Sequence, residues 1–499
     1  MNKLKAIIIL STALLWSSLS SGQSIIDTSI LFSQSNYGGS ARVLGIGGSQ
    51  VSLGGDVSSI VSNPAGLGMF NRSVISFSTG LNFITTRSGY HDTTTPDQKA
   101  NVNIPNMSLV LYKELDSRYT EFKSTSFGVS YNRTNDFHQE YTYQGRGGNS
   151  MLDFFLDRAQ GVSIQDFEDG NSEYFNDLDG LAARTFLIFP TSDEDPDNGF
   201  DDEYISDILG SPLQTEVVSI KGSQSQVSFS YGANYDDKLF LGGGVGLTSI
   251  DYSSTKTYEE RDFEYNDPDD PDYINPLNSY TLEENLNISG GGINATLGLI
   301  FRPADFMQIG GSLTTPTYYS IDDEYDARLN VDYIDFNDED AETDILVSNY
   351  SLITPLRVSG GATFFIGKYG FVSADIEMLN YGKNNIKSDD FFTLEDNQDI
   401  SAKYGKSYNL KFGSEYRYDM FRFRAGYGHY AKPQIGEGSS RNVFSGGFGV
   451  RVKKYFLDLA VVNTQFSEAY SPYPLGSDTP VADINNSNTK GVITFGVNF

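Results

Sequence analysis

The chain has 499 residues, a formal net charge of −30 and no cysteine. The absence of cysteine excludes disulfide bonds and thiolate metal sites. The acidic balance argues against nucleic acid as a partner, because neutralising phosphates requires a surplus of Lys and Arg. Mean hydropathy is −0.33, so a bundle of membrane helices is not expected.

The N-terminus, residues 1–22, has the pattern of a signal peptide. Lys3 and Lys5 form a basic start, a short apolar run follows, and Ser20 and Gly22 are small residues suited to cleavage. The apolar run is too short to span a bilayer, which makes a membrane anchor the weaker interpretation.

The segment that follows, residues 23–72, has neither the period of a strand nor that of a helix. Its glycines permit sharp turns and close backbone packing, and an Asn-Pro pair marks a further turn. We expect this apolar, irregular segment to form a plug inside the rest of the chain. The residues that we assign to the plug and its movement are Gly45, Gly47, Gly48, Asp56, Asn63, Pro64 and Ala65.

Two polar residues of this segment need partners if the segment is buried. The Asn63 side chain either ties the plug to its container or caps its own turn. Asp56 would be costly inside a plug unless it is paired, and Arg42 is a candidate partner.

From residue 73 to residue 499 the chain alternates apolar and polar residues with a period of two, as in Ile75-Ser76-Phe77-Ser78. The connections at one end of the expected strands are short, and those at the other end are long and acidic. This asymmetry and the terminal aromatic residue Phe499 favour a membrane barrel over a soluble sandwich. The predicted fold is therefore all-β: a transmembrane antiparallel β-barrel of about 14 strands whose lumen is plugged by an N-terminal hatch. The strands are expected to start near residues 73, 103, 122, 214, 238, 279, 306, 343, 369, 403, 419, 440, 454 and 486.

The largest insert is residues 146–214, where residues 151–158 and 172–187 have the pattern of short amphipathic helices. A second acidic stretch, residues 267–272, reads DPDDPD. It lacks the spacing and the terminal Glu of an EF-hand, so we interpret it as a solvated loop rather than a calcium site.

The run GIGGSQVSLGGD at residues 45–56, followed by Asn-Pro-Ala at residues 63–65, resembles the N-terminal hatch of the FadL/TodX family of outer-membrane transporters for hydrophobic compounds. Residues 314–316, 351–361 and 411–416 are similar to later parts of that family's barrel, whereas the 146–214 insert has no counterpart. The resemblance implies a Gram-negative outer-membrane location. It also implies passive transport of long-chain fatty acids or other hydrophobic compounds, with lateral release beside a kinked strand.

The resemblance also implies the partners: a hydrophobic small molecule, membrane lipid and lipopolysaccharide, and the barrel-assembly machinery acting through Phe499. We expect a monomer. The alternative is a barrel that serves as a binding or shuttle partner of a secretion machine, as PorV-type proteins do. The complete hatch-like segment favours transport, while the large insert leaves room for the alternative.

No catalytic set is present, so no enzyme activity and no cofactor are predicted. The three histidines, His91, His138 and His429, show no metal-ligand spacing, and no GxSxG elbow or P-loop occurs. By strand parity, four cations face the lumen and could bind a fatty-acid carboxylate: Arg357, Lys411, Arg422 and Arg424. Alternatively, each could pair with an inward acid such as Glu415.

Overall fold

The computed structural model describes residues 25–34, 38–116, 118–172, 174–191, 203–206, 211–264, 276–334, 336–436 and 438–499. The predicted signal peptide, the first residues of the predicted hatch and the DPDDPD loop lie outside these ranges.

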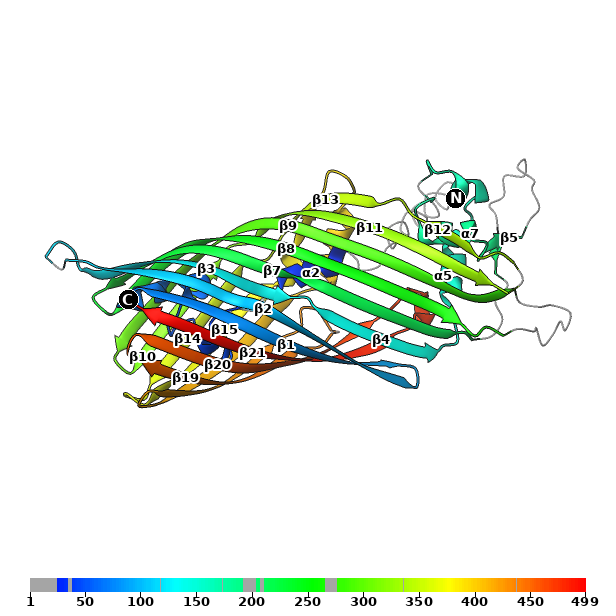
Figure 1. Cartoon of the computed structure of the whole chain (residues 1–499). Helices are drawn as coiled ribbons and strands as arrows, with labels where there is room; N and C mark the ends of the chain where they lie inside the picture. Colours follow the sequence, from blue (N-terminus) through cyan, green and yellow to red (C-terminus); the bar gives the residue numbers. More distant parts are fainter. Residues whose placement is uncertain are drawn as a thin grey trace.

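The wall is a closed antiparallel barrel of 14 strands. It closes because β1 (Val74–Tyr90) pairs with β2 (Thr93–Glu114) on one side and with β21 (Ala482–Asn498) on the other. The uninterrupted strands between them are β7 (Leu213–Tyr235), β8 (Leu239–Arg261), β9 (Leu277–Ala304), β17 (Lys406–Tyr418), β18 (Phe421–Tyr430), β19 (Arg441–Val452) and β20 (Tyr455–Tyr470). The all-β barrel predicted from the sequence is confirmed (Figure 1).

Four wall strands are interrupted, each in two pieces. The pieces are β3 (Phe122–Asp136) with β4 (Gln139–Arg146), β10 (Met307–Thr314) with β11 (Tyr318–Tyr333), β13 (Leu346–Ile353) with β14 (Arg357–Phe365), and β15 (Gly370–Asn380) with β16 (Asn385–Lys387). Pro316 and Pro355 lie in two of the interruptions, where the missing N–H and fixed φ of proline disfavour a continuous ladder. Short β12 (Glu339–Glu342) pairs with β11, and β5 (Phe189–Pro190) pairs with β6 (Tyr204–Ile205) outside the wall.

The outer surface carries an apolar belt next to the short turns. On β7 and β8, for example, Phe229, Tyr231, Leu241 and Val245 are exposed, while their sequence neighbours point inward. An apolar exterior with small and polar residues inside is the pattern of a barrel that lies in a bilayer. In the described part of the chain, no helix has both the length and the hydropathy to cross a membrane.

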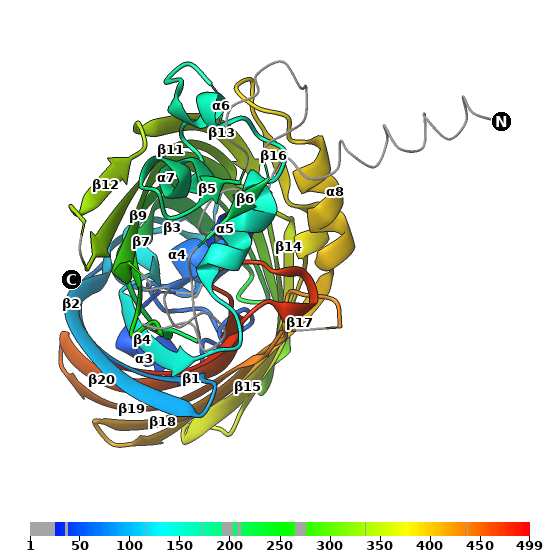
Figure 2. The same ribbon diagram turned by 90° about the vertical axis from the view of Figure 1, so that its right-hand side faces the viewer.

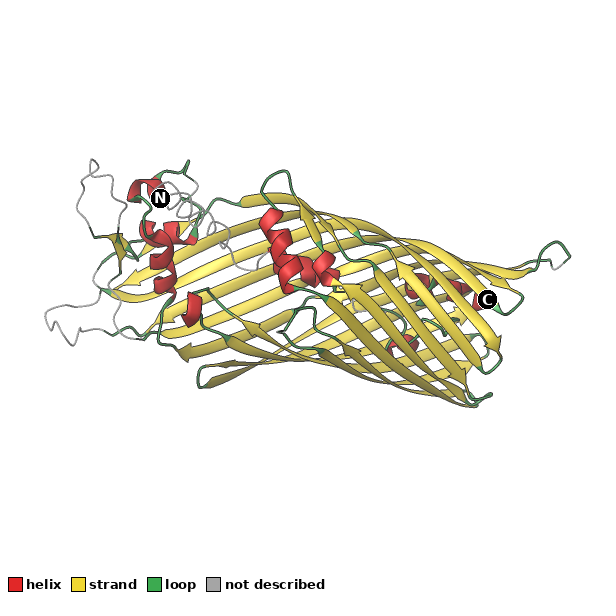
Figure 3. Ribbon diagram, turned by 180° about the vertical axis from the view of Figure 1, so that it is seen from behind, coloured by secondary structure: helices red, strands yellow, loops and turns green. Residues whose placement is uncertain are grey.

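The barrel rim is uneven. Strands β7, β8 and β9 are 23, 23 and 28 residues long, whereas β17, β18 and β19 have 13, 10 and 12 residues. Above the tall strands lies a cap formed by α5 (Met151–Ala159), α6 (Ile164–Glu168) and α7 (Leu178–Arg184) (Figure 2). We call the side of the short strands the low side of the rim. There, α8 (Leu394–Lys403) lies along the wall (Figure 3).

Most predicted strand starts agree with the structure to within a few residues, but the second strand starts at Thr93 rather than near residue 103. The β1–β2 hairpin is longer than expected, because the two strands stay paired as far as Tyr90 and Thr93. In the insert, the predicted helix at residues 151–158 corresponds to α5, and only Leu178–Arg184 of residues 172–187 is α-helical.

Candidate functional site

Residues 38–72 lie inside the barrel, at the end with the short turns (Figure 1). They form α3 (Ala41–Leu44), α4 (Ser59–Ser62) and the 3-10 helix η1 (Pro64–Met69), joined by turns. Gly47 and Gly48 have φ of 67° and 75°, a region that favours glycine, and this explains the irregular sequence pattern. Short helices and turns of this kind bring both the backbone of the segment and some of its side chains, such as those of Ile60 and Leu67, against the wall.

Six inward glycines of the wall receive the plug, and we call them the docking glycines: Gly232, Gly242, Gly298, Gly310, Gly413 and Gly426. Backbone atoms approach most of them, whereas the atom nearest to a Cβ at Gly298 would be Asn63 Oδ1. A Cβ added at Gly232 would lie 2.6 Å from the Pro64 carbonyl oxygen, and one at Gly310 would lie 2.6 Å from the Ser52 Cα. A glycine inside a strand commonly marks such a close backbone approach. The sequence analysis did not single these glycines out.

The Asn63 side chain joins the plug to itself and to the wall. It is 1% exposed. Its Nδ2 donates to the Val51 carbonyl at 2.6 Å and lies 3.3 Å from that of Gly311 in β10, while its Oδ1 accepts from the Ala65 N–H at 3.2 Å. Both predicted roles, tying the plug to the wall and capping a turn, are therefore present together. Pro64 and Ala65 start η1 and pack against Gly242 of the wall.

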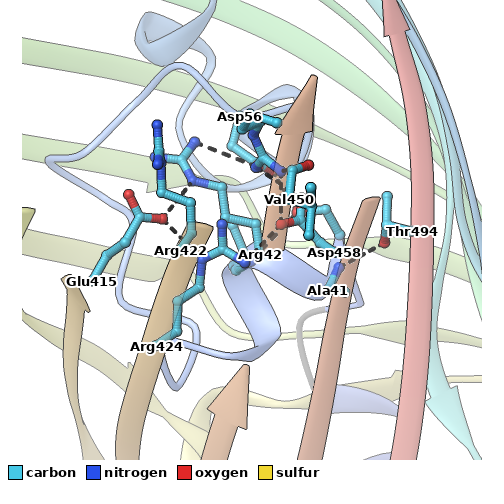
Figure 4. Close-up of polar contacts among 12 residues, drawn as sticks. Ala41, Arg42, Asp56, Glu415, Arg422, Arg424, Val450, Asp458 and Thr494 are labelled. Carbon is cyan, nitrogen blue, oxygen red and sulfur yellow. Dashed lines mark hydrogen bonds and ion pairs between the residues drawn. The ribbon is translucent and has the colours of Figure 1, made fainter. Parts of the chain in front are cut away.

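Asp56 is buried and is held by several groups of the plug. Its Oδ1 accepts from the Ser40 hydroxyl at 2.8 Å and from the Ser58 N–H at 2.9 Å, and its Oδ2 lies 3.6 Å from Arg42 Nη1. Arg42 also reaches Glu415 of β17, with 3.5 Å between Nε and Oε2 (Figure 4). A chain of charges thus runs from the plug into the wall.

Arg424 continues this chain across the wall (Figure 4). Its Nε lies 2.8 Å from Glu415 Oε2 and its Nη1 lies 2.7 Å from Asp458 Oδ1, and its side chain is 0% exposed. Arg451 also pairs with Asp458 at 2.9 Å. These pairings offset part of the cost of burying charge, while Arg424 Nη2 is buried without a hydrogen-bond partner among the described residues.

The other three predicted carboxylate-binding cations are also engaged. Lys411 lies 3.5 Å and Arg357 4.0 Å from the same carboxylate oxygen of Glu377. Arg422 Nη1 donates to the backbone carbonyls of Asp419 and Phe421 at 2.7 Å each. The structure thus shows the pairing alternative for Arg424, Lys411 and Arg357, while their role as ligand sites stays a prediction.

Above the plug, the helix α2 (Ile25–Ser33) crosses the lumen. Its last carbonyls accept hydrogen bonds from the wall: Gln224 Nε2 donates to Phe32 O at 3.0 Å, and the Asn135 amide donates to Gln34 O. From another part of the wall, the Asn384 amide donates to Ser29 O in the middle of the helix at 3.1 Å. The bonds at Phe32 and Gln34 satisfy carbonyls that an isolated helix end leaves unpaired.

A cavity of about 1600 Å³ lies between α2 and the cap. Its floor includes Ile30 and Leu31 of α2, and its roof includes Met151 and Phe154 of α5. On the low side of the rim it reaches the surface at Phe392, which is 100% exposed. Among the described residues that line the cavity are Lys256 and Arg441, but none of the four predicted carboxylate-binding cations.

The cap is fixed to the wall by Glu260 of β8. Its Oε1 accepts from the Met151 N–H at 2.9 Å, from Tyr258 OH at 2.7 Å and from Gln214 at 3.0 Å, and Oε2 accepts from the Ser150 hydroxyl. A carboxylate at the first N–H groups of α5 also interacts favourably with the helix dipole. The part of the insert that forms α5 is therefore docked on the wall.

The wall has a seam between β2 and β3. Their ladder ends at the pair Asn106 and Asn132, so residues 93–105 of β2 and 133–136 of β3 form no backbone pairs with each other within the described ranges. Pro105, which has no N–H, lies at the end of the ladder. Each strand still pairs with its other neighbour, β1 or β7.

Side chains bridge the seam at Asp136. This carboxylate accepts hydrogen bonds from Asn82, Asn101 and Asn103 at 2.6, 3.0 and 2.7 Å, and His138 Nδ1 lies 2.8 Å away. Behind the seam passes the plug, where a Cβ added at Gly38 would clash with the Arg133 carbonyl oxygen and lie 3.3 Å from that of Pro105. The cavity reaches the same place, because Asp136 and His138 are among its lining residues.

These features define a class of protein: a closed 14-strand membrane β-barrel with an occupied lumen and a cavity above the plug. No protein-family model and no curated protein matches the sequence.

Solved structures do match the fold. A FadL homologue from Pseudomonas aeruginosa is 12% identical, with a TM-score of 0.54, over 93% of this chain and 99% of that one. The toluene transporter TodX from P. putida is 13% identical, with a TM-score of 0.52, over 93% and 99% of the two chains. The monoaromatic hydrocarbon channel CymD is 12% identical, with a TM-score of 0.50, over 93% and 98%. The chain shares the fold of these channels, as the resemblance of its N-terminal segment predicted.

Proposed function

We propose that this protein is a passive outer-membrane channel for hydrophobic compounds, in which residues 23–72 act as a hatch and cargo leaves sideways through the seam. The observation that carries the proposal is the continuity between the cavity and the seam, since Asp136 and His138 belong to both. A hydrophobic molecule that leaves through the wall enters lipid without crossing water, whereas a vertical path would deliver it to an aqueous compartment.

The fold supports this proposal, because the matched structures are titled as a FadL homologue, a toluene transporter and a monoaromatic hydrocarbon channel. The barrel exterior also supports it, since an apolar belt suits a bilayer. Long-chain fatty acids and neutral hydrocarbons are the two cargo classes to be compared. We further propose that the chain acts as a monomer and that Phe499, which is 57% exposed, directs its assembly.

Uptake by cells tests transport. A Gram-negative host that lacks its own channel of this kind is supplied with the protein, and uptake of radiolabelled oleate and toluene is measured. Faster uptake than in cells with an empty vector is expected for at least one of the two compounds. Uptake at the empty-vector rate for both would refute transport.

A disulfide across the seam tests lateral release. Because the chain has no cysteine, the pair Pro105→Cys with Arg133→Cys can be oxidised without competing thiols. The matched control is Ser225→Cys with Ser249→Cys, which are register partners in the intact β7–β8 ladder. Oxidation should slow uptake several-fold only for the seam pair, and a reductant should restore it. Unchanged uptake with the seam bond formed would refute lateral release and leave transport standing.

A further inference from the structure

The cavity between α2 and the cap has an unusual charge balance. Its lining carboxylates are Asp27, Asp136, Glu284, Glu395, Asp396 and Glu468. Its lining cations are Lys256 and Arg441, together with the titratable His138. Many of the remaining lining residues are Tyr or Phe. The space is therefore aromatic and, in formal charge, negative.

Both cations already interact with aromatic rings, and Lys256 also interacts with carboxylates. Lys256 lies over the Tyr470 ring, with 5.7 Å to the centroid, and interacts with the charges of Glu216 and Asp27. Arg441 lies over the Tyr430 ring at 5.4 Å. A carboxylate on a ligand would have to compete with these acids and rings for the same positive charge.

Of the lining carboxylates, Asp136 is already paired with Arg133 at 3.3 Å, whereas Glu468 and Asp396 face the space with few positive partners. Glu468 is exposed to the cavity and accepts only amide hydrogen bonds, from Asn486 at 3.1 Å and Gln139 at 3.4 Å. Within the described ranges, no Lys or Arg nitrogen lies within 4.0 Å of it. At the low rim, burial raises the pKa of Asp396, and the neighbouring charges of Asp399 and Glu395 raise it further.

We infer that the cavity binds hydrophobic compounds that carry a protonated amine in preference to the carboxylate of the same carbon skeleton. This rests on the proposed function and narrows its substrate class. An ammonium group is attracted both by the faces of aromatic rings and by carboxylates, and the cavity supplies both. Of the cations that sequence parity assigned to a fatty-acid carboxylate, three are paired with wall carboxylates and Arg422 is bonded to backbone carbonyls. None of the four is among the described residues that line the cavity.

Three matched, water-soluble compounds test the inference: 2-phenylethylammonium, 2-phenylethanol and phenylacetate. Their dissociation constants for the purified full-length protein in non-ionic detergent at pH 7 are measured by titration calorimetry. One unit charge at 4 Å in water corresponds to about a fivefold effect, so the amine should bind about 25-fold more tightly than the acid, with the alcohol between them.

Variants locate the effect. Glu468→Gln should weaken amine binding about fivefold and strengthen acid binding by a similar factor. The control is Asp340→Asn, which removes an exposed carboxylate on β12, outside the cavity lining. It should change neither value.

Equal or tighter binding of phenylacetate would overturn the charge preference and leave the proposed transport intact. An unchanged amine affinity in Glu468→Gln, equal to that in Asp340→Asn, would overturn the assignment of the preference to this cavity. Failure of all three compounds to bind, the uncharged alcohol included, would overturn the assignment of the cavity as a binding site, while the uptake of oleate and toluene tests the proposed transport separately.

Discussion

A methyl group added at Gly310 should push the plug away from the wall. The new Cβ would lie 2.6 Å from Ser52 Cα, about 0.8 Å closer than ordinary van der Waals contact. Gly311 provides a matched control, because a Cβ there meets nothing closer than the Ser359 carbonyl oxygen at 3.7 Å. The two substitutions are neighbours on one strand and differ only in the face they occupy.

The expected magnitude follows from the bonds that converge on this contact. Asn63 donates to Val51 O at 2.6 Å, Val51 N donates to Asp375 at 2.9 Å, and the Ser52 and Thr363 hydroxyls are 2.8 Å apart. If the shift breaks these three bonds at about 1 kcal/mol each, docking weakens by about 3 kcal/mol. The population of undocked plug then rises about 150-fold.

Single-channel recording in planar bilayers measures this population as ion conductance. Gly310→Ala should open far more often than the native protein, and Gly311→Ala should match the native protein. Heat-dependent gel mobility checks that both barrels are folded. Equal conductance of the two variants would refute the view that the docking glycines hold the plug.

Three further outcomes are expected. Arg424→Gln removes one charge-assisted hydrogen bond from each of two buried carboxylates, Glu415 and Asp458, which keep other cationic partners. It should lower the free energy of unfolding by about 3–5 kcal/mol, whereas Arg422→Gln, which loses only backbone partners, should change it by less than about 1 kcal/mol. Urea titration in lipid vesicles compares them, and equal losses would contradict the ion-pair argument. Asn63→Ala should weaken plug docking by about 2 kcal/mol and so increase protease cleavage within residues 38–72. Cleavage at the native rate would show that the Asn63 side chain is dispensable for docking. Glu260→Ala should release the cap, so that protease cuts within residues 146–212 while the barrel stays intact, and resistance of that segment would argue against the anchor.

The barrel could be predicted because a two-residue period is a local property, visible in segments such as Ile75 to Phe83. Strand parity also placed Lys411 and Arg424 on the inner face, where both are buried. Glu415, named from the sequence as a possible inward partner, does pair with Arg424. The second partner, Asp458, could not be predicted, because it meets Arg424 across an intervening strand and the register of distant strands is not visible in the sequence.

The cavity was beyond sequence reasoning for a different reason. Its lining comes from α2, the cap, the segment before α8 and the region around Tyr470, which are brought together only by the closed barrel. The docking glycines did carry a signal, since Gly310 and Gly298 interrupt otherwise good strands. That signal is weak at single positions, because glycine is frequent along the inner face of this wall.

The docking glycines have a consequence for how such barrels can be rebuilt. At Gly242, Gly310 and Gly426 the wall contacts the main chain of the tail, because hydrogen atoms stand where side chains would otherwise be. A foreign tail with the same sequence of turns should therefore seat in this wall even if few of its residues are shared. Exchanging N-terminal plugs between distantly related barrels would then separate the contribution of the plug to permeation from that of the barrel wall.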